Sequence, residues 1–333
     1  MKPFSLRRVQ IKTMVLFCLL PLLAVSCISA NIQNSPLSGH VDLQGHRGAR
    51  GLHPENTIPA FKSCIANKMN TIELDTNLTK DKELIVYHDS IVNSELCRDE
   101  KGNPAQALPI KELTVADLKK LDCGSIQDKK FPRQVPQKNI QLITLSEFFD
   151  FATDYDTKFP ANNPLQFNIE VKLGENDSRE EALEAARIMV QTIESAGMAH
   201  RTTVQSFDLA VLREVKRLNP KLTTSALFEP TRFKWLKMFL GLNADRYEII
   251  HKTLAAGANV ISPYHLYVNP EFVKVCHEND IAVLPWTVNK EKTMLKMLDC
   301  GVDGIISDYP DILYQVYTEW EKANHLKNST KKR

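Results

Sequence analysis

The chain has 333 residues, of which 43% are hydrophobic and 25% are charged. These proportions are typical of a globular protein and argue against long disorder, a collagen-like repeat or a multi-span membrane protein. The formal net charge is +2, from 42 Lys+Arg against 40 Asp+Glu, which is too balanced for a nucleic-acid-binding protein with a basic surface.

Residues 1–30 differ from the rest of the chain. Four basic residues stand before any acid, the apolar run Met14–Val25 follows, and small residues end the segment. This order is typical of a secretory signal peptide, and a run of about 12 residues is shorter than the ~20 that span a bilayer. We therefore expect an exported protein, in the bacterial periplasm or held at the cell envelope. Loss of the leader removes four of the 42 basic residues and no acid, which leaves 38 basic against 40 acidic side chains.

The end of the leader is compatible with two kinds of processing. Leu23–Cys27 resembles a lipoprotein box, in which Cys27 is lipidated and becomes the new N-terminus. Cleavage after Ala30 by an ordinary signal peptidase fits equally well. A lipid on Cys27 is the only membrane attachment that we expect.

From residue 41 onward, short apolar segments of strand type alternate with helical segments. In chain order, the expected strands are Val41–Gly45, Thr71–Asn77, Leu165–Lys172, Thr202–Ser206, Thr223–Phe228, Asn259–Pro263, Ile281–Val288 and Gly304–Ser307. The expected helices are Ile58–Asn67, Arg179–Ala196, Leu209–Leu218, Arg246–Ala256, Pro270–Glu278 and Lys290–Leu298. Eight strands in βα units over about 270 residues favour an α/β fold of the closed (β/α)₈ TIM-barrel type, over residues 41–318. A doubly wound open sheet is the alternative.

One segment interrupts the alternation of strands and helices. Only a short polar turn separates Thr71–Asn77 from Glu83–His88, so these segments are expected to form a β-hairpin. A turn centred near Asp81 would place position 75 opposite position 87 and bring His88 back to the same level.

The residues after this hairpin, about 90–142, carry weak strand signals and one short helix at Thr114–Leu121, which indicates an insertion on the barrel rim. Residues 319–333 read as a polar tail, frayed from Glu321.

Five cysteines follow the leader, and none belongs to a C-x-x-C pair, so a zinc site is poorly supported. Cys97 and Cys123 fall in the same irregular stretch, where an oxidising compartment would permit a disulfide. The five are Cys64, Cys97, Cys123, Cys276 and Cys300.

Ionisable residues gather at the ends of the expected strands, where barrel enzymes carry their active sites. Glu73 and Asp75 are two residues apart, as are Glu170 and Lys172, so each pair points to one face of its strand. Inward carboxylates are costly unless they are paired or bind a cation. Three carboxylates without Cys or His at ligand spacing favour Ca²⁺ or Mg²⁺. The alternative is a buried ion-pair network with Arg47 and Lys172, although three acids exceed what two cations need.

Two histidines, His46 and His88, end the first strand and the hairpin. Two histidines beside a candidate metal site are suited to general acid–base catalysis near neutral pH. Arg47 and Lys172 add positive charge suited to a phosphate. The combination predicts phosphoryl transfer or hydrolysis.

Several motifs, in order over roughly residues 43–312, resemble the glycerophosphodiester phosphodiesterase family. H-R-G or H-D alone would be weak, whereas the ordered combination is specific. The motifs are H-R-G-A-R-G-L-H-P-E-N-T from His46, I-E-L-D from Ile72, T-K-D from Thr79, V-Y-H-D from Val86, N-I-E-V-K from Asn168, V-Q-S-F from Val204, W-T-V-N from Trp286 and G-V-D-G-I-I-S-D-Y-P from Gly301.

The resemblance implies a (β/α)₈ barrel with a rim insertion and a defined set of site residues. It assigns acid–base catalysis to His46 and His88, a divalent cation to Glu73, Asp75 and Glu170, phosphate contact to Arg47 and Lys172, and a supporting or ligand role to Glu55. Gln205, Phe207, Trp286 and His265 lie at strand ends and are expected to line the pocket, with simple packing as the alternative for the two aromatic residues. Ca²⁺ is favoured over Mg²⁺ because it tolerates irregular carboxylate sites and is plentiful outside the cytoplasm.

The expected reaction is metal-dependent hydrolysis of small glycerophosphodiesters, such as glycerophosphocholine, to sn-glycerol 3-phosphate and an alcohol. One histidine would take the proton of the glycerol 2-hydroxyl while the other protonates the departing alcohol, through a cyclic glycerophosphate. One alternative is a sphingomyelinase D-like phospholipase, which the continuous P-E-N-T and N-I-E-V-K motifs and the lack of an obvious apolar membrane-insertion loop disfavour. The other is a non-catalytic surface binding protein on the same barrel, although no expected catalytic residue is missing.

Overall fold

The computed structural model describes residues 36–159, 164–239 and 246–331. The predicted leader over residues 1–30, with Cys27, lies outside these ranges. Within the described ranges, no helix combines the length and the apolar character that a membrane crossing requires.

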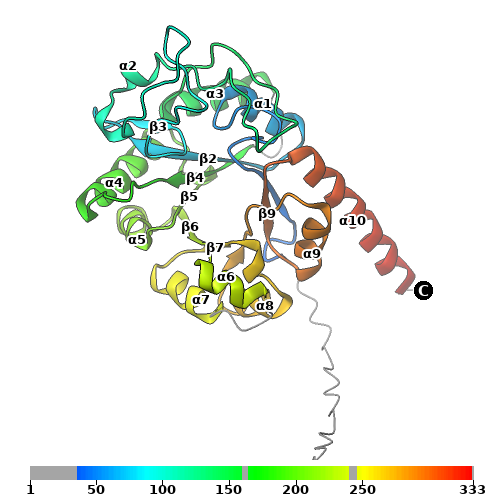
Figure 1. Ribbon diagram of the computed structural model, residues 1–333. Helices are drawn as coiled ribbons and strands as arrows, with labels where there is room; N and C mark the ends of the chain where they lie inside the picture. Colours follow the sequence, from blue (N-terminus) through cyan, green and yellow to red (C-terminus); the bar gives the residue numbers. More distant parts are fainter. Residues whose placement is uncertain (1–35, 160–163, 240–245, 332–333) are drawn as a thin grey trace, which may run out of the picture. The chain divides into compact units, whose positions relative to one another are not determined.

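Eight parallel strands follow one another around a barrel, and the additional strand β3 pairs antiparallel with β2 (Figure 1). The strands are β1 (Asp42–Gly45), β2 (Thr71–Leu78), β3 (Leu84–Val86), β4 (Gln166–Val171), β5 (Thr202–Ser206), β6 (Thr223–Phe228), β7 (Val260–Pro263), β8 (Ala282–Val283) and β9 (Gly304–Ser307). Backbone hydrogen bonds close the ring between β8 and β9, from Asp303 N to Val283 O at 3.0 Å and from Val288 N to Ile306 O at 2.9 Å. The predicted (β/α)₈ barrel is therefore confirmed, and the open sheet is excluded.

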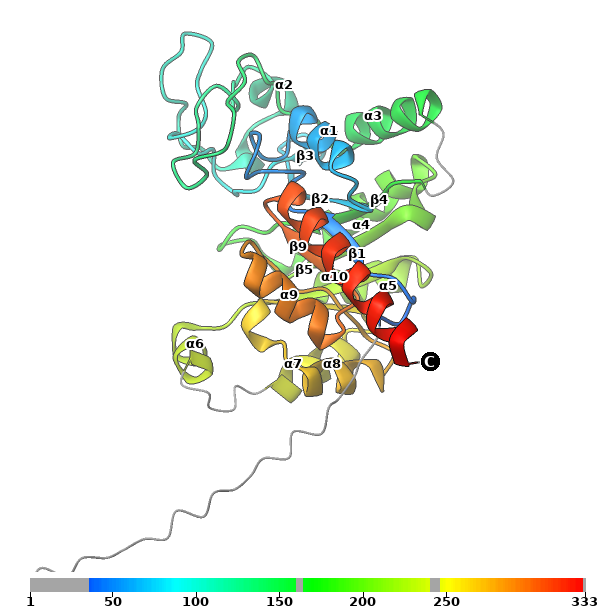
Figure 2. The same ribbon diagram turned by 90° about the vertical axis from the view of Figure 1, so that its right-hand side faces the viewer.

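Helices surround the barrel (Figures 1 and 2). They are α1 (Ile58–Ala66), α2 (Val115–Leu118), α3 (Leu145–Lys158), α4 (Arg179–Ser195), α5 (Leu209–Leu218), α6 (Arg232–Phe239), α7 (Arg246–Ala255), α8 (Pro270–His277), α9 (Glu291–Cys300) and α10 (Pro310–Lys331), with 3₁₀ turns at Ile110–Glu112, Ala199–Arg201 and His265–Tyr267.

Three of these helices, α3, α6 and α10, were not predicted. The start of α3 is marked by a capping box in which Thr144 and Glu147 bond each other's backbone N–H groups. The tail expected to fray from Glu321 is instead the end of α10, which contains no Gly or Pro between its first residue, Pro310, and its end at Lys331. The expected last-but-one strand, Ile281–Val288, is shortened to Ala282–Val283.

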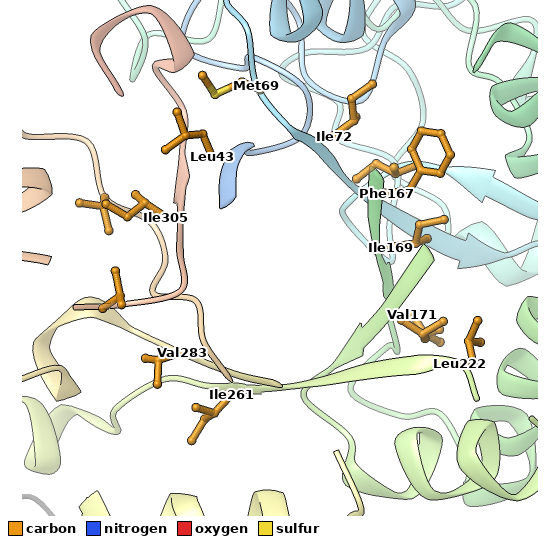
Figure 3. Packing of buried hydrophobic residues seen from close by; sticks show 14 of the residues in the cluster. Leu43, Met69, Ile72, Phe167, Ile169, Val171, Leu222, Ile261, Val283 and Ile305 are labelled. Carbon is orange, nitrogen blue, oxygen red and sulfur yellow. The ribbon is translucent and has the colours of Figure 1, made fainter. Parts of the chain in front are cut away.

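The main core lies between the strands and the helices. Apolar side chains on the strands point away from the centre of the barrel, as Figure 3 shows for Leu43, Ile72, Ile169, Ile261 and Ile305. All five are at most 2% exposed. Because side chains alternate along a strand, the residues between them point inward.

The interior of the barrel is partly polar. Asn168 donates hydrogen bonds to Gln44 at 2.9 Å and to Gln205 at 3.1 Å, and the hydroxyls of Ser225 and Ser262 bond each other at 2.8 Å. This network satisfies polar groups that would be costly to bury alone. This network lies inside the barrel, next to the charged residues at the strand ends.

The predicted hairpin and insertion are both present. Thr76 pairs with Val86, and Tyr87 donates its backbone N–H to Asp75 O at 3.0 Å, so position 75 lies opposite position 87 as expected. The insertion contains the short helix α2 and its own small buried cluster, and the predicted disulfide Cys97–Cys123 is formed within it.

Candidate active site

The strand register brings the predicted acidic residues together. Asp75 on β2 lies directly opposite Glu170 on β4, and Glu170 lies opposite Gln205 on β5. Glu73 stands two residues before Asp75 and points to the same face. Four functional side chains from three neighbouring strands therefore meet at one end of the barrel.

Three buried carboxylates form a candidate metal site. Glu73, Asp75 and Glu170 each offer an oxygen, and the three oxygens lie within 4.8 Å of one another. Burial and the neighbouring Asp75 raise the pKa of Glu73, and the same two causes raise the pKa of Glu170 to about 8 against the pull of Lys172. Oδ1 of Asp75 is buried without a hydrogen-bond partner. Crowded carboxylates with an unsatisfied oxygen fit a hard divalent cation, which would relieve their repulsion.

Uncharged donors hold two of these carboxylates in place. The backbone N–H of Arg47 and the side-chain amide of Gln205 donate to the two oxygens of Glu73, both at 2.7 Å. Asn56 donates to Asp75 Oδ2 at 2.9 Å and accepts from its backbone N–H at 3.2 Å. The carboxylates are thus oriented independently of any cation.

An ion-pair network also exists, as the alternative prediction proposed, but it does not satisfy the whole cluster. Arg47 lies 2.8 Å from Glu55 and 3.3 Å from Asp75, and Lys172 lies 3.0 Å from Glu170. Although burial disfavours its charge, Glu55 and Asp75 raise the pKa of Arg47. Among the described residues, no basic side chain forms an ion pair with Glu73. The pairs therefore orient the site without replacing a cation.

The loop after β1 adopts an unusual backbone to present these groups. Arg47 has φ +49°, in the left-handed region that residues other than glycine rarely adopt. The next residue, Gly48, has φ +81° and donates its N–H to Glu73 O at 3.0 Å. Strain of this kind is typical of functional sites, where the surrounding structure maintains it.

His46 is buried and held by a carboxylate. Its Nδ1 lies 2.6 Å from Asp308, which also accepts a hydrogen bond from Asn289 at 2.6 Å and pairs with Arg50 at 2.9 Å. Burial lowers the pKa of His46 to about 4, although Asp308 opposes the shift. The imidazole is therefore neutral at neutral pH, with Nδ1–H donating to Asp308 and Nε2 left as a base.

His88 is held in a similar way at the end of the hairpin. Its Nδ1 lies 2.6 Å from Asp89, and Asn93 donates to the other oxygen of Asp89 at 3.3 Å. Lys172 donates to Nε2 of His88 at 3.1 Å. Each histidine thus has a carboxylate on Nδ1. This contact fixes the orientation of the ring, so Nε2 is the nitrogen that is available for proton transfer.

A cavity of about 420 Å³ opens over these residues. Most of the predicted site residues line it, namely His46, Arg47, His88, Glu170, Lys172, Gln205, Phe207 and Trp286. Phe207 and Trp286 meet edge to face with centroids 5.5 Å apart. His265 is not in the lining, because the chain turns into a 3₁₀ helix and the His265 ring packs against Tyr264 with ring centroids 4.5 Å apart. Glu55 forms ion pairs with Arg47 and Arg50. These contacts fit the supporting role, which was one of the two roles expected for Glu55.

The structure adds residues to which the sequence analysis gave no role. They are Asn56, Arg50, Asp89, Asn289 and Asp308. All five belong to quoted motifs, and Asp308 also directly follows the last strand, which was the signal that could have identified it. Asn56 carries no charge, so nothing in its spacing distinguished it from a turn residue.

The chain matches known proteins over nearly the whole barrel. The sequence profile of the Glycerophosphoryl diester phosphodiesterase family matches residues 46–312. A glycerophosphodiester phosphodiesterase of Caldanaerobacter subterraneus is 32% identical over 270 residues, which cover 80% of this chain and 94% of the relative. The chain therefore belongs to the glycerophosphoryl diester phosphodiesterase family and is an enzyme of that class.

Solved structures are similar over the same region. One, assigned as a glycerophosphoryl diester phosphodiesterase of Silicibacter pomeroyi, has a TM-score of 0.75 at 27% identity and covers 87% of this chain and 96% of its own. A phosphodiesterase of Oleispira antarctica, solved in complex with the product sn-glycerol-3-phosphate, has a TM-score of 0.65 at 19% identity and covers 84% of this chain and 98% of its own. The second likeness concerns the fold alone.

Proposed function

We propose that the enzyme hydrolyses glycerophosphodiesters to sn-glycerol 3-phosphate and an alcohol, with His46 and His88 as the acid–base pair. The observation that carries this proposal is the cavity itself, whose lining combines two carboxylate-held histidines, several cations and Glu170. Glu170 also belongs to the buried cluster of three carboxylates. Support for the substrate class comes from the family and from the 32% identical relative named as a glycerophosphodiester phosphodiesterase.

The cations of the cavity would bind the phosphodiester. Arg47, Arg50 and Lys172 line the cavity, and guanidinium and ammonium groups pair readily with phosphate oxygens. Ion pairs to Glu55, Asp308 and Glu170 hold these three side chains before substrate arrives. Such preorganised charge stabilises the negative charge of a phosphoryl transition state.

The two histidines would move the protons. His46, neutral at neutral pH, is suited to accept a proton at Nε2, and Asp308 would stabilise the imidazolium that results. His88 would exchange a proton with the substrate at Nε2 while Asp89 holds its Nδ1–H. Lys172, which donates to that nitrogen, would transfer its hydrogen bond to the phosphate when substrate binds. A cyclic glycerophosphate is the intermediate that we infer, formed when the glycerol 2-hydroxyl attacks phosphorus and the bond to the head-group alcohol breaks. Water would then break the new bond between phosphorus and O2, which gives sn-glycerol 3-phosphate.

A divalent cation would be held by Glu73, Asp75 and Glu170, and when bound it would supply a Lewis acid for the phosphate and the attacking hydroxyl. We infer Ca²⁺ rather than Mg²⁺, because buried carboxylates of unequal environment suit its flexible coordination. Gln205 and Asn56 would keep the ligand oxygens in place during turnover.

We also infer that the enzyme acts outside the cytoplasm. The leader over residues 1–30 supports export, and the disulfide Cys97–Cys123 is of a kind that forms in oxidising compartments. Mass spectrometry of the mature N-terminus distinguishes a lipidated Cys27 from a free Asn31. An N-terminus at Met1 would contradict export.

A panel of glycerophosphodiesters tests the proposal. Purified enzyme should release sn-glycerol 3-phosphate from glycerophosphocholine or glycerophosphoethanolamine, and His46→Ala or His88→Ala should each lower kcat about 10²–10⁴-fold. His200→Ala, at a histidine outside the cavity, is the matched control and should leave kcat unchanged. Full activity in either site variant contradicts the assignment. Faster turnover of micellar sphingomyelin than of glycerophosphocholine would favour the phospholipase alternative.

A further inference from the structure

The helix α6 exposes aromatic side chains beside the mouth of the barrel. It follows β6, whose end contributes Leu227 and Glu229 to the lining of the cavity. Phe233 is 67% exposed and Trp235 is 42% exposed. Figures 1 and 2 show α6 projecting from the same end of the barrel as the insertion. This exposed aromatic surface therefore lies on the face from which substrate enters.

The same helix is basic. Arg232 is exposed, Lys237 places its Nζ 4.8 Å from the ring centroid of Phe233, and Lys234 forms an ion pair with α7. Residues 230–244 contain no Asp or Glu. Phe233 and Trp235 stand two positions apart, so they project from different sides of the helix. The described side chains of the helix thus combine exposed aromatic groups with cationic ones.

The exposed aromatic side chains and the basic residues of α6 together indicate the kind of partner that this helix would bind. Phe and Trp interspersed with Lys and Arg are typical of segments that lie in the headgroup region of a bilayer, where the rings are buried and the cations meet anionic lipid. A second copy of the same helix would bring like charges together, which disfavours self-association through this surface. An anionic phospholipid surface satisfies both the aromatic and the basic groups.

We propose that α6 is a membrane-contact helix that places the mouth of the barrel against an anionic phospholipid surface. The inference goes beyond the proposed hydrolysis and does not require it. Sequence reasoning missed this segment because the basic residues interrupt the apolar ones, so no continuous apolar loop stands out.

Hydrogen exchange on the full chain tests the proposal. Vesicles of phosphatidylcholine containing about a quarter phosphatidylglycerol should slow exchange in the peptide that covers α6, and pure phosphatidylcholine vesicles should do so much less. Because this readout reports α6 itself, any affinity of the N-terminal segment for lipid does not affect it.

Co-sedimentation with the same vesicles supplies a quantitative comparison. The double substitution Phe233→Ala/Trp235→Ala should lower partitioning about tenfold. Leu295→Ala/Tyr314→Ala, which removes two exposed side chains from α9 and α10, is the matched control and should bind like wild type. All these variants share one N-terminus, so its contribution cancels. Hydrolysis of soluble glycerophosphocholine should be equal in all of them.

Three outcomes would overturn the inference. The first is unchanged exchange in α6 on addition of anionic vesicles. The second is equal sedimentation of wild type and the double variant. The third is protection of α6 that depends on protein concentration rather than on lipid, which would indicate a second copy as the partner. If the double variant fails to fold, Arg232→Glu/Lys237→Glu tests the same surface through its charge. A wild-type enzyme without hydrolytic activity would contradict the proposed function and leave these binding results interpretable.

Discussion

Asp308 is the residue on which the geometry of His46 depends most directly. It lies 2.6 Å from Nδ1 of the histidine, and Asn289 and Arg50 hold it in turn. A buried carboxylate in this position fixes the ring and its tautomer and stabilises the imidazolium during turnover. We assign Asp308 as a positioning residue for His46.

Asp308→Asn tests this assignment. The amide cannot stabilise an imidazolium, so kcat should fall by at least about tenfold. Loss of the ion pair that holds Arg50 should raise KM by a smaller factor. Asp303→Asn is the matched control, because Asp303 also holds a histidine, His277, at 2.7 Å but at the other end of β9. Equal kcat in Asp308→Asn and wild type, or an equal loss in the two variants, would show that the contact is only structural.

The lowered pKa of His46 leads to a second prediction, which concerns how the free energy of unfolding depends on pH. In the unfolded chain its pKa is near 6.5, whereas burial lowers it to about 4 in the fold. Between these two values the unfolded state binds more protons, so the free energy of unfolding falls as the pH drops from about 6.5 to 4. Above that window His46 contributes no pH dependence.

Urea unfolding at several pH values from about 4 to about 7, a range that covers this window, measures this effect. Wild type should lose up to about 3 kcal/mol more than His46→Gln across the window, since each pKa unit is worth about 1.4 kcal/mol. All other titrating groups are present in both proteins, so the difference reports His46 together with the carboxylate that it contacts, Asp308. Parallel curves for the two proteins would refute the shifted pKa.

At this scale the sequence predicted the acidic residues of the core strands well, and it gave no role to several residues in or beside the loops. Glu73, Asp75 and Glu170 stood out because acids are rare in core strands, and the register brings them together as expected. Asn56 carried no such signal, and its bonds to Asp75 depend on a loop that turns back at φ +57°. His265 failed as a prediction because its position just beyond a strand end did not reveal the 3₁₀ turn that removes it from the cavity.

Among the elements, the loop between β1 and α1 is the one most constrained by the site. Gly48 has φ +81°, and a Cβ added there would lie 2.8 Å from the backbone carbon of Ala60 in α1. Both a left-handed backbone and close packing therefore require glycine at this position.

Gly48→Ala should destabilise the protein by roughly 3 kcal/mol, as strain and overpacking add. The control is Gly102→Ala, because Gly102 has φ +82° but nothing within 4 Å of an added Cβ. This control should cost only about 1 kcal/mol, from the backbone alone. Thermal or urea unfolding compares the two. A Gly48→Ala variant no less stable than Gly102→Ala would contradict the close packing of this loop on α1.

The elements themselves were predicted where periodicity was regular. The barrel strands repeat a buried apolar pattern, and helices such as α4 and α5 carry clear stop and start signals. The helix α3 was missed although its Thr144–Glu147 capping box is visible in the sequence, since it follows an irregular insertion. The helix α6 was missed because aromatic and basic residues alternate within it, and no single face identifies it.

At the scale of the whole molecule, a near-neutral chain gathers a group of buried ionisable side chains at one end of a barrel. The formal net charge of +2 gives no sign of this arrangement. The register of β2, β4 and β5 assembles the acidic cluster, the hairpin returns His88 to it, and β9 delivers Asp308 from the far end of the sequence. Closure of the barrel is therefore a condition for the site, because Asp308 and His46 stand on its last and first strands.

The central claim is that this enzyme hydrolyses glycerophosphodiesters with a cation held by Glu73, Asp75 and Glu170. It is tested most directly by release of sn-glycerol 3-phosphate from glycerophosphocholine, before and after the metal is removed with EDTA and then restored with Ca²⁺ or Mg²⁺. We predict that EDTA abolishes release, that Ca²⁺ restores it better than Mg²⁺, and that no metal restores Glu73→Gln to the wild-type rate. Undiminished release in EDTA, or a Glu73→Gln variant as active as wild type, would contradict the claim.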